Sequence, residues 1–304
     1  MSDVGGPRPG TIIGEAAKPP FAVLPNPSSL FLTRSERLAA LAPGHGLGPY
    51  LTFLAALTRA QHDILHDLPR AALPSFERIG QALEHGMPPL ARAMLDVDDV
   101  ADATVARFLA RMARAEVPQQ TSVAVATLEA LSPEERRKAV AAVLHDQPAI
   151  ADVAQRVLIQ AGLQVHMARL AALLPADDLK PVADGACPAC GSAPMTSSVV
   201  GWPKAHNTRF CTCSLCATMW NVVRVKCVMC GSPDGIAFKS IEGQPDTIKA
   251  ETCDKCHSYV KILYQVKDAV LEPMADDVAT LGLDMLLVAE GWKRGGQNPF
   301  LLGY

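Results

Sequence analysis

The sequence predicts a multidomain protein of α plus small β class: an N-terminal all-α helical bundle, two tandem four-cysteine metal units and a C-terminal helix. Three observations predict this class. Residues 29–183 are rich in alanine and leucine and repeat apolar side chains at helical spacing. All nine cysteines lie between Cys187 and Cys256. The cysteine pattern C-x2-C-x22-C-x2-C occurs twice, with the second copy 40 positions after the first, and such a repeat is typical of duplicated structural units.

The chain is expected to begin with a tail at residues 1–28, followed by the helical bundle at 29–183. Residues 1–28 are rich in glycine and proline and predict a flexible arm. Six or seven helices are then expected, because turn signals separate the apolar repeats. Their predicted ranges are 31–42, 47–67, 74–85, 99–116, 118–131, 132–145 and 148–174. Ser132 with Pro133 and the two glutamates that follow predicts one helix start, since serine caps a helix and acids favour its positive end.

Two of these helices show a clear apolar face. In the second helix this face carries one polar interruption, Gln61, and its apolar members are Tyr50, Leu54, Leu57 and Ile64. In the last helix the face recurs every three or four residues at Val153, Val157, Ala161, Val165, Ala168 and Ala172. Both patterns indicate helices that pack against a core.

The cysteine-rich third predicts two metal sites. Eight cysteines form four C-x-x-C pairs, with 22 residues between the two pairs of each copy. The pairs are Cys187/Cys190, Cys213/Cys216, Cys227/Cys230 and Cys253/Cys256. Two thiolates at this spacing can face one ion, and two such pairs complete a tetrahedral four-cysteine shell. A unit of this size buries too little surface to fold alone, so a bound ion would contribute about 10 kcal/mol or more to its folding.

Local signals describe the two units further. Gly191 and Gly231 follow the first pair of each copy and suit a turn with positive φ. Short hairpin segments are expected at 195–201 and 235–241, and strands at 220–225 and 259–266.

Several readings of the cysteines stay open. Disulfides are disfavoured by a reducing compartment, and a thioredoxin-like role lacks a βαβ context. Four-thiolate shells suit zinc and mononuclear iron alike. The repeat favours sequential pairing of the C-x-x-C motifs over a crossed one. Cys211 has Glu251 as its counterpart in the second copy and is expected to be an ordinary buried thiol, with a ligand swap or a redox role as alternatives.

Outside the cysteines few residues predict chemistry. His62 and His66 lie four residues apart and could hold a metal, but a polar helix face is favoured. His257 follows Cys256 and is expected to face solvent rather than to donate to a cysteine sulfur. A last helix is expected over 273–290, and the final apolar residues are expected to dock back on the bundle. The stripe of this helix comprises Val278, Leu281, Met285 and Val288.

Composition restricts location and partners. The formal charge is −3, and no uninterrupted run of about 18 apolar residues suggests a membrane span. The N-terminus shows no secretory pattern, so a cytoplasmic location is expected. Residues 187–256 carry seven basic and five acidic side chains, and two four-thiolate sites with divalent ions bring this part to about −2. A nucleic-acid-binding zinc ribbon, which needs a positive field, is therefore disfavoured.

Several segments resemble the FdhE family of formate dehydrogenase accessory proteins. The specific ones are CPACGS at 187–192, RFCTCSLCATMWNVVRVKCVMC at 209–230, IKAETCDKCHSYVKILYQVKD at 248–268, ADDVATLGLDMLLVAEG at 275–291 and NPF at 298–300. A looser similarity covers 34–61, so the resemblance extends over roughly residues 30 to 302. It implies a helical domain followed by two rubredoxin-like units. It also implies iron bound by the same eight cysteines that the spacing selects.

The resemblance implies a function as well. Proteins of this family are required in the cytoplasm for active respiratory formate dehydrogenase and associate with its catalytic subunit before twin-arginine export. We therefore expect a maturation factor and not an enzyme, since a closed four-cysteine shell leaves no open position for substrate. A rubredoxin-like electron-transfer protein is the alternative. The expected parts are a tail at 1–28, a helical domain at 29–183, metal units at 184–224 and 225–268, and a C-terminal helix and tail at 269–304.

Overall fold

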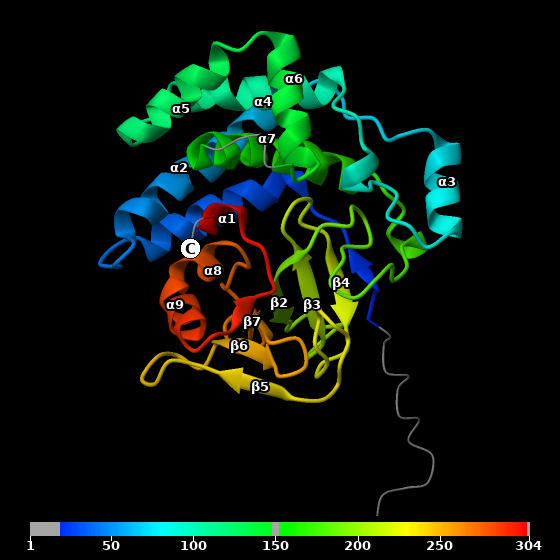
Figure 1. The fold of residues 1–304 in the computed structure, drawn as a ribbon, viewed down its shortest axis with the longest axis vertical. Helices are drawn as coiled ribbons and strands as arrows, with labels where there is room; N and C mark the ends of the chain where they lie inside the picture. The colour runs from blue at the N-terminus through cyan, green and yellow to red at the C-terminus, as the bar shows by residue number, and fades with distance from the viewer. Residues whose placement is uncertain (1–18, 148–151, 303–304) are drawn as a thin grey trace, which may run out of the picture.

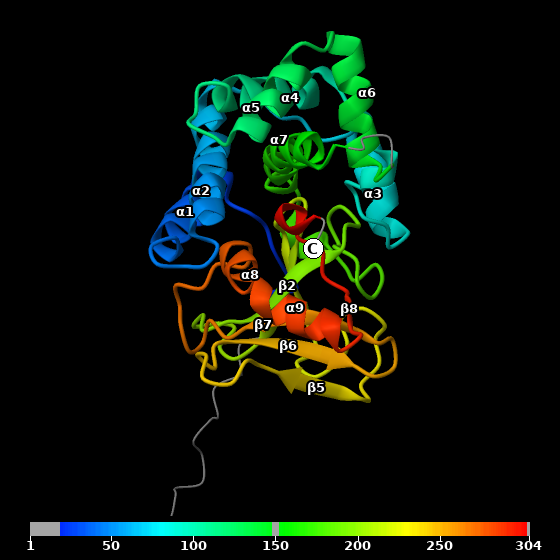
Figure 2. The same cartoon turned by 60° about the vertical axis from the view of Figure 1, so that its left-hand side comes forward.

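A computed structural model of the protein describes residues 19–147 and 152–302. It has a helical layer packed on a sheet-rich part, and the C-terminal helices lie against the sheet (Figure 1). Turning the molecule keeps the two parts distinct (Figure 2). This is the predicted fold class, and the structure confirms it.

The helical layer contains a helix in each predicted range. Its helices are α1 (Pro27–Leu41), α2 (Gly48–Asp63), α3 (Phe76–Glu84), α4 (Asp99–Met112), α5 (Gln119–Glu129), α6 (Pro133–Leu144) and α7 (Val153–Ala171). Short 3-10 turns η1 (Ile64–Asp67), η2 (Arg92–Met94) and η3 (Ala176–Asp178) connect them. The capping box expected at Ser132 forms with Glu135. The first residues of the range 148–174 lie outside the described residues.

Helix α7 is the centre of this layer, because most of its surface is buried against other elements. Gly162 lets α4 approach closely: a Cβ atom there would lie 3.0 Å from Val105 Cγ2 and 3.1 Å from its Cα. The expected apolar face is buried at Ala161, Val165 and Ala168, whereas Val153 in the first turn is exposed. Gln61, the polar interruption on α2, is buried and donates to the Ala161 carbonyl at 2.8 Å.

The sheet joins the two cysteine units. Its strands are β1 (Ala22–Val23), β2 (Pro194–Val199), β3 (Arg209–Cys213), β4 (Met219–Val222), β5 (Ile236–Lys239), β6 (Ile248–Cys253), β7 (Ser258–Leu263) and β8 (Lys293–Arg294). The order is β1-β4-β3-β2-β7-β6-β5, with β8 beside β7. Each unit is an antiparallel meander of three strands, β2–β4 or β5–β7, and each strand of the first recurs about 40 residues later in the second.

The two meanders meet through a parallel pair of strands. The first strand of the first copy pairs in parallel with the last strand of the second, with Ser197 opposite Ile262 and Ser198 opposite Leu263. Because this pair is parallel, strands β7, β6 and β5 run in the same directions as β4, β3 and β2, respectively. Strand β1, from the start of the described chain, pairs with β4 and covers that edge.

The C-terminal helix differs from its expectation. The range 273–290 contains two helices, α8 (Ala275–Ala279) and α9 (Leu281–Ala289), separated at Thr280. At Thr280 the backbone leaves the helical conformation, with φ of −99° and ψ of +28°, and the Lys261 ammonium lies 3.0 Å from the Thr280 carbonyl and 2.8 Å from the Asp277 carbonyl. The helix is interrupted there, and the predicted stripe was wrong in its second half: Met285 is 63% exposed and Val288 is 55% exposed.

The chain end does return to the bundle, as expected. Phe300 and Leu301, in the turn η4 (Pro299–Leu301), are buried, and the Tyr50 hydroxyl on α2 donates to the Phe300 carbonyl at 2.5 Å. Tyr304 lies outside the described residues. Within the described chain, no helix has the length and hydropathy needed to span a membrane.

Candidate metal centres

The first cysteine group is deeply buried between the helical layer and the sheet. Its four members come from the loop before β2 and from the turn that joins β3 to β4; they are Cys187, Cys190, Cys213 and Cys216. All four are buried. The Sγ atoms of Cys187 and Cys216 are 3.7 Å apart, and those of Cys190 and Cys213 are 3.4 Å apart.

The second group repeats this construction at the outer end of the sheet. Its members are Cys227, Cys230, Cys253 and Cys256. The Sγ distances are 3.7 Å between Cys227 and Cys256 and 3.8 Å between Cys230 and Cys253. Here Cys230 is exposed and Cys256 is half-buried, so solvent reaches the second group and not the first.

The donor set fits a tetrahedral ion. A four-thiolate shell with metal–sulfur bonds of about 2.3 Å has sulfur–sulfur edges of about 3.8 Å. In both groups the four sulfur atoms lie within 4.8 Å of one another. Each group consists of the cysteines of one copy, which is the sequential arrangement that the repeat favoured.

The same local turn builds the first half of both groups. The Cys187 amide donates to the Ser192 carbonyl at 2.9 Å, and the Gly191 amide donates to the Cys187 carbonyl at 2.8 Å. The second copy has the matching bonds at 2.9 and 3.0 Å. Gly191 and Gly231 adopt φ of +76° and +73°, as predicted. At Gly231 a Cβ atom would meet the end of the Asp184 side chain, which can move, so it is the positive φ that favours glycine in this turn.

Backbone amides and hydroxyls surround the sulfur atoms. The amides of Leu215 and Cys216 both lie 3.4 Å from Cys213 Sγ. The Thr218 hydroxyl is 3.2 Å from Cys216 Sγ, and the Ser258 hydroxyl is 2.9 Å from Cys256 Sγ. The two amides donate to sulfur, and a hydroxyl this close to a deprotonated sulfur can donate to it as well, which stabilises the negative charge and fixes the direction of the ligand.

The helical layer holds the first group in place. Gln164 on α7 accepts from Gln61 at 3.2 Å and donates to the Ser214 carbonyl at 2.9 Å, inside the Cys213–Cys216 turn. The amides of Leu90 and Arg92 donate to the carbonyls of the Cys187–Cys190 turn at 2.8 and 3.0 Å. The packing of the helices therefore determines where this group sits.

Cys211 stands apart from both groups. It lies in the middle of β3, opposite Ser197 on one side and Trp220 on the other, and it is fully buried. Burial raises the pKa of the Cys211 thiol to about 12. No four-cysteine group among the described residues includes it. Its counterpart Glu251 occupies the same place on β6 and forms an ion pair with Arg209 at 2.7 Å.

The histidines do not join the cysteine groups. His257 is exposed and its ring stacks on Trp292 with centroids 4.5 Å apart. His62 and His66 pack edge to face at 6.2 Å, and the described residues give them no third metal-binding side chain. The exposure of His257 matches the expectation that it faces solvent.

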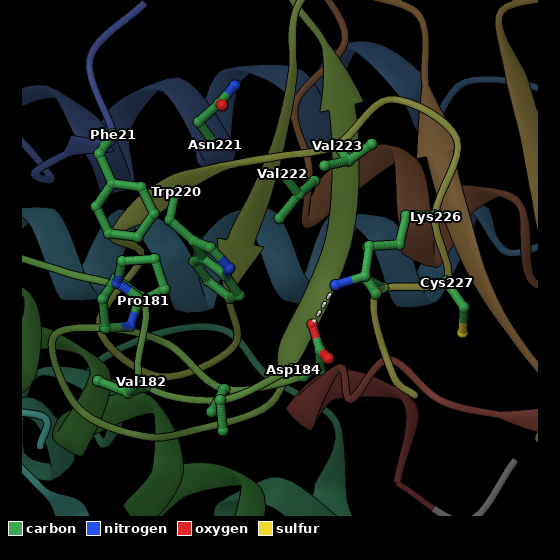
Figure 3. Close-up of a pocket in the computed structure, with 15 residues that line it drawn as sticks. Phe21, Pro181, Val182, Asp184, Trp220, Asn221, Val222, Val223, Lys226 and Cys227 are labelled. Atoms are coloured by element: carbon green, nitrogen blue, oxygen red, sulfur yellow. Dashed lines mark hydrogen bonds and ion pairs between the residues drawn. The ribbon is translucent and has the colours of Figure 1, made fainter. Parts of the chain in front are cut away.

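A cavity of about 310 Å3 is lined mainly by the segments 181–188 and 220–228. Figure 3 shows Phe21 and Trp220 at one side of it and the ion pair of Lys226 with Asp184, at 3.1 Å, at the other. Its lining includes Cys227 of the second group. Its charged lining residues pair with each other.

Sequence reasoning missed a buried ionic cluster behind the second unit. Lys261 on β7 lies 3.2 Å from Asp277 and 2.5 Å from Asp284, and Arg294 on β8 pairs with the same two carboxylates. The Tyr259 hydroxyl donates to Asp284 at 2.8 Å. The available signal was the set of acids inside the apolar segment 275–291. The cluster fixes α8 and α9 to the sheet.

Fold and site together define a class: a helical protein that carries two tandem four-cysteine units in one sheet. Three sequence profiles match the chain in order, described as FdhE, N-terminal over residues 19–184, FdhE, central domain over 186–224 and FdhE, C-terminal domain over 225–301. The chain belongs to the FdhE family. Membership of this family supports a role as a formate dehydrogenase accessory protein.

Relatives of known name agree over nearly the whole length. The chain is 40% identical to the "Protein FdhE homolog" of Rhizobium meliloti, over 97% of each chain. It is 34% identical to the "Protein FdhE" of Salmonella choleraesuis, over 93% of this chain and 91% of that one. The crystal structure of the FdhE protein from Pseudomonas aeruginosa matches with a TM-score of 0.83 at 33% identity, over 94% of this chain and 99% of the other.

Proposed function

We propose that this protein is a maturation factor of respiratory formate dehydrogenase and acts on the catalytic subunit in the cytoplasm, before twin-arginine export. Family membership supports the enzyme system. The observation that carries the proposal is the construction of the cysteine-rich part, in which two four-cysteine groups belong to one continuous sheet. Such a part suits a binding surface better than a substrate pocket, because each shell uses all four of its positions.

We further propose that the eight grouped cysteines are the ligands of two mononuclear ions, iron in the cell with zinc as the alternative occupant. The sulfur–sulfur distances of 3.4 to 3.8 Å support a tetrahedral shell in each group. Bound ions would stabilise each unit, and iron would in addition supply an Fe(II)/Fe(III) couple. The chain contributes the amides and hydroxyls that orient the sulfurs.

The unequal burial of the groups supports a division of roles. The first group belongs to the main hydrophobic core, together with helical residues such as Leu163 and Phe108. We assign it a structural role, since its loss would disturb the interface between the helices and the sheet. The second group reaches solvent through Cys230 and lies where a partner can approach it.

A pull-down from the cytoplasm of cells that express formate dehydrogenase tests the proposal. Tagged wild-type protein is expected to retain the catalytic subunit, and Cys187→Ser and Cys227→Ser are expected to lose it. Cys211→Ala is the matched control, because this cysteine is equally buried but stands outside both groups. Recovery of the catalytic subunit by all four proteins would contradict a role for the metal units in docking.

Electron transfer by rubredoxin-like iron is the second candidate function. The exposure of Cys230 favours it, since an exposed ligand brings a redox centre near the surface. Iron-loaded protein that cycles reversibly with dithionite and air would support this function. Protein that is isolated with zinc alone, and is active in maturation, would exclude it.

A further inference from the structure

A cavity of about 430 Å3 lies where the start of α1, the end of α2 and the end of α7 meet. It is separate from the cysteine groups. Four side chains that can carry positive charge line it: His62, His66, Arg70 and Arg169. Among its described lining residues there is no aspartate or glutamate. The described wall of the cavity therefore combines several cationic or protonatable side chains with no acidic side chain.

The two arginines of this cavity differ from most arginines of the helical layer. Arg34, Arg111 and Arg136, for example, each pair with a carboxylate. By contrast, neither Arg70 nor Arg169 forms an ion pair with a described residue.

Arg169 is the more informative of the two. Its Nη2 donates to the Pro69 carbonyl at 2.5 Å, which fixes the guanidinium at the cavity wall. Its Nη1 is buried and has no hydrogen-bond partner among the described residues. Burial lowers the pKa of Arg169, because solvent is removed and no carboxylate replaces it. A buried donor of this kind is costly to leave unpaired, so it indicates a missing acceptor.

The surroundings of the histidines agree with an acceptor rather than a metal. His62 Nδ1 is also buried without a partner among the described residues. Two guanidinium groups beside the histidine pair would repel a cation and attract an anion. Helix α1 adds to the same field, since its positive end begins at Pro27 in the cavity wall, although Asn26 already accepts from the Ser28 amide.

Size and chemistry define the ligand. Arginine guanidinium groups and helix N-termini are common elements of phosphate-binding sites. A phosphate has enough oxygen atoms to accept hydrogen bonds from several donors at once. The remaining wall is apolar and includes Leu65, Ala71 and Leu173. The volume is in the range of small-molecule sites. We propose that this cavity binds the phosphate group of a small phosphorylated ligand, with Arg70 and Arg169 as its principal contacts and the apolar wall against the ligand body.

Titration calorimetry on the full-length, metal-loaded protein tests this site with three probes: inorganic phosphate, AMP and adenosine. We expect saturable binding of phosphate, tighter binding of AMP because the apolar wall is then used, and no binding of adenosine. Arg70→Gln and Arg169→Gln are each expected to weaken phosphate and AMP binding about tenfold or more, since a charge-assisted hydrogen bond contributes about 1.5–3 kcal/mol.

Arg114→Gln is the matched control, because Arg114 is exposed in the turn that follows α4 and does not line this cavity. Arg70 is also exposed, so its replacement leaves the fold intact and keeps the test decisive even if Arg169→Gln is unstable. Absence of saturable phosphate binding at millimolar concentrations would overturn the proposal. Equal affinity of wild type and Arg70→Gln, or equally tight binding of acetate, would overturn it as well.

Discussion

Arg209 of the first cysteine unit and Glu251 of the second form an ion pair inside the sheet, with Arg209 Nη1 2.7 Å from a Glu251 carboxylate oxygen and side-chain exposures of 0% and 3%. Arg209 also donates to Ser197 Oγ on β2, the strand at the junction of the two meanders. Glu251 occupies the position that Cys211 holds in the first copy. The two copies therefore differ at this position, and the glutamate of the second copy forms an ion pair with the first.

Removing one partner of this ion pair is expected to lower the free energy of unfolding strongly, whereas removing both partners should lower it much less. Glu251→Leu should lower the free energy of unfolding by about 3–5 kcal/mol, because Arg209 is left buried without its counter-charge. Arg209→Met with Glu251→Leu should recover most of that loss. Urea unfolding of the two variants measures both values. Equal losses in the single and the double variant would show that the pair's charge is unimportant.

The cluster around Lys261 should behave in the same way. Lys261→Met leaves Arg294 as the one counter-charge that the described residues give Asp277 and Asp284, and it removes the ammonium donor from the carbonyls of Asp277 and Thr280. We expect a loss of about 3–5 kcal/mol in unfolding free energy. Lys255→Met, at an exposed position of the same unit, is the control and should change little. If both substitutions have the same small effect, the cluster does not fix the C-terminal helices.

Stability should fall in mild acid because of His166. Burial lowers the pKa of His166 to about 4; Asp98 opposes this shift and Arg169 adds to it. The folded pKa is below the unfolded value of about 6.5, so this contribution is complete above pH 6.5 and is lost as the pH falls toward 4, to a total of about 3 kcal/mol.

Unfolding in urea at pH 7 and pH 5 measures this effect. His166→Gln should show a smaller decrease between the two values than wild type, whereas the exposed His85→Gln should match wild type. Protonation of the cysteines affects all three proteins alike, so the difference between variants isolates His166. An identical decrease in all three would rule out His166 as a source of acid sensitivity.

The amide chain from Gln61 through Gln164 to Ser214 should couple the helices to the first cysteine group. Gln164→Leu leaves the Ser214 carbonyl and the Gln61 amide without this partner, and we expect a loss of about 1–3 kcal/mol. Metal should also leave the first group faster in this variant. Gln120→Leu on the exposed face of α5 serves as the control. Unchanged metal release in Gln164→Leu would mean that the chain is not needed to hold the site.

Metal should leave the two groups at different rates. The second group is open to solvent at Cys230, and the first is buried throughout, so a chelator is expected to remove one ion quickly and the other slowly. Cys227→Ser should abolish the fast phase and Cys187→Ser the slow one. A single phase for both ions, or the opposite assignment, would contradict the unequal roles proposed for the groups.

Sequence patterns predicted the helices and the cysteine groups because both follow short-range rules. Apolar spacing located α1 to α7, and the 40-residue repeat anticipated which cysteines share a group. The parallel pairing of β2 with β7 was not predictable, since it joins segments more than 60 residues apart with no local signal. The break at Thr280 involves Lys261 from a distant strand. The unpaired Nη1 of Arg169 results from tertiary packing and has no local sequence signal.

The central claim is that both metal units are required for the activation of formate dehydrogenase. The most direct measurement is formate dehydrogenase activity in a host that lacks its own copy of this protein, supplied with wild type, Cys187→Ser, Cys227→Ser or Cys211→Ala at matched soluble levels. The account predicts activity with wild type and Cys211→Ala and little or none with the other two. Full activity with Cys187→Ser or Cys227→Ser would contradict it.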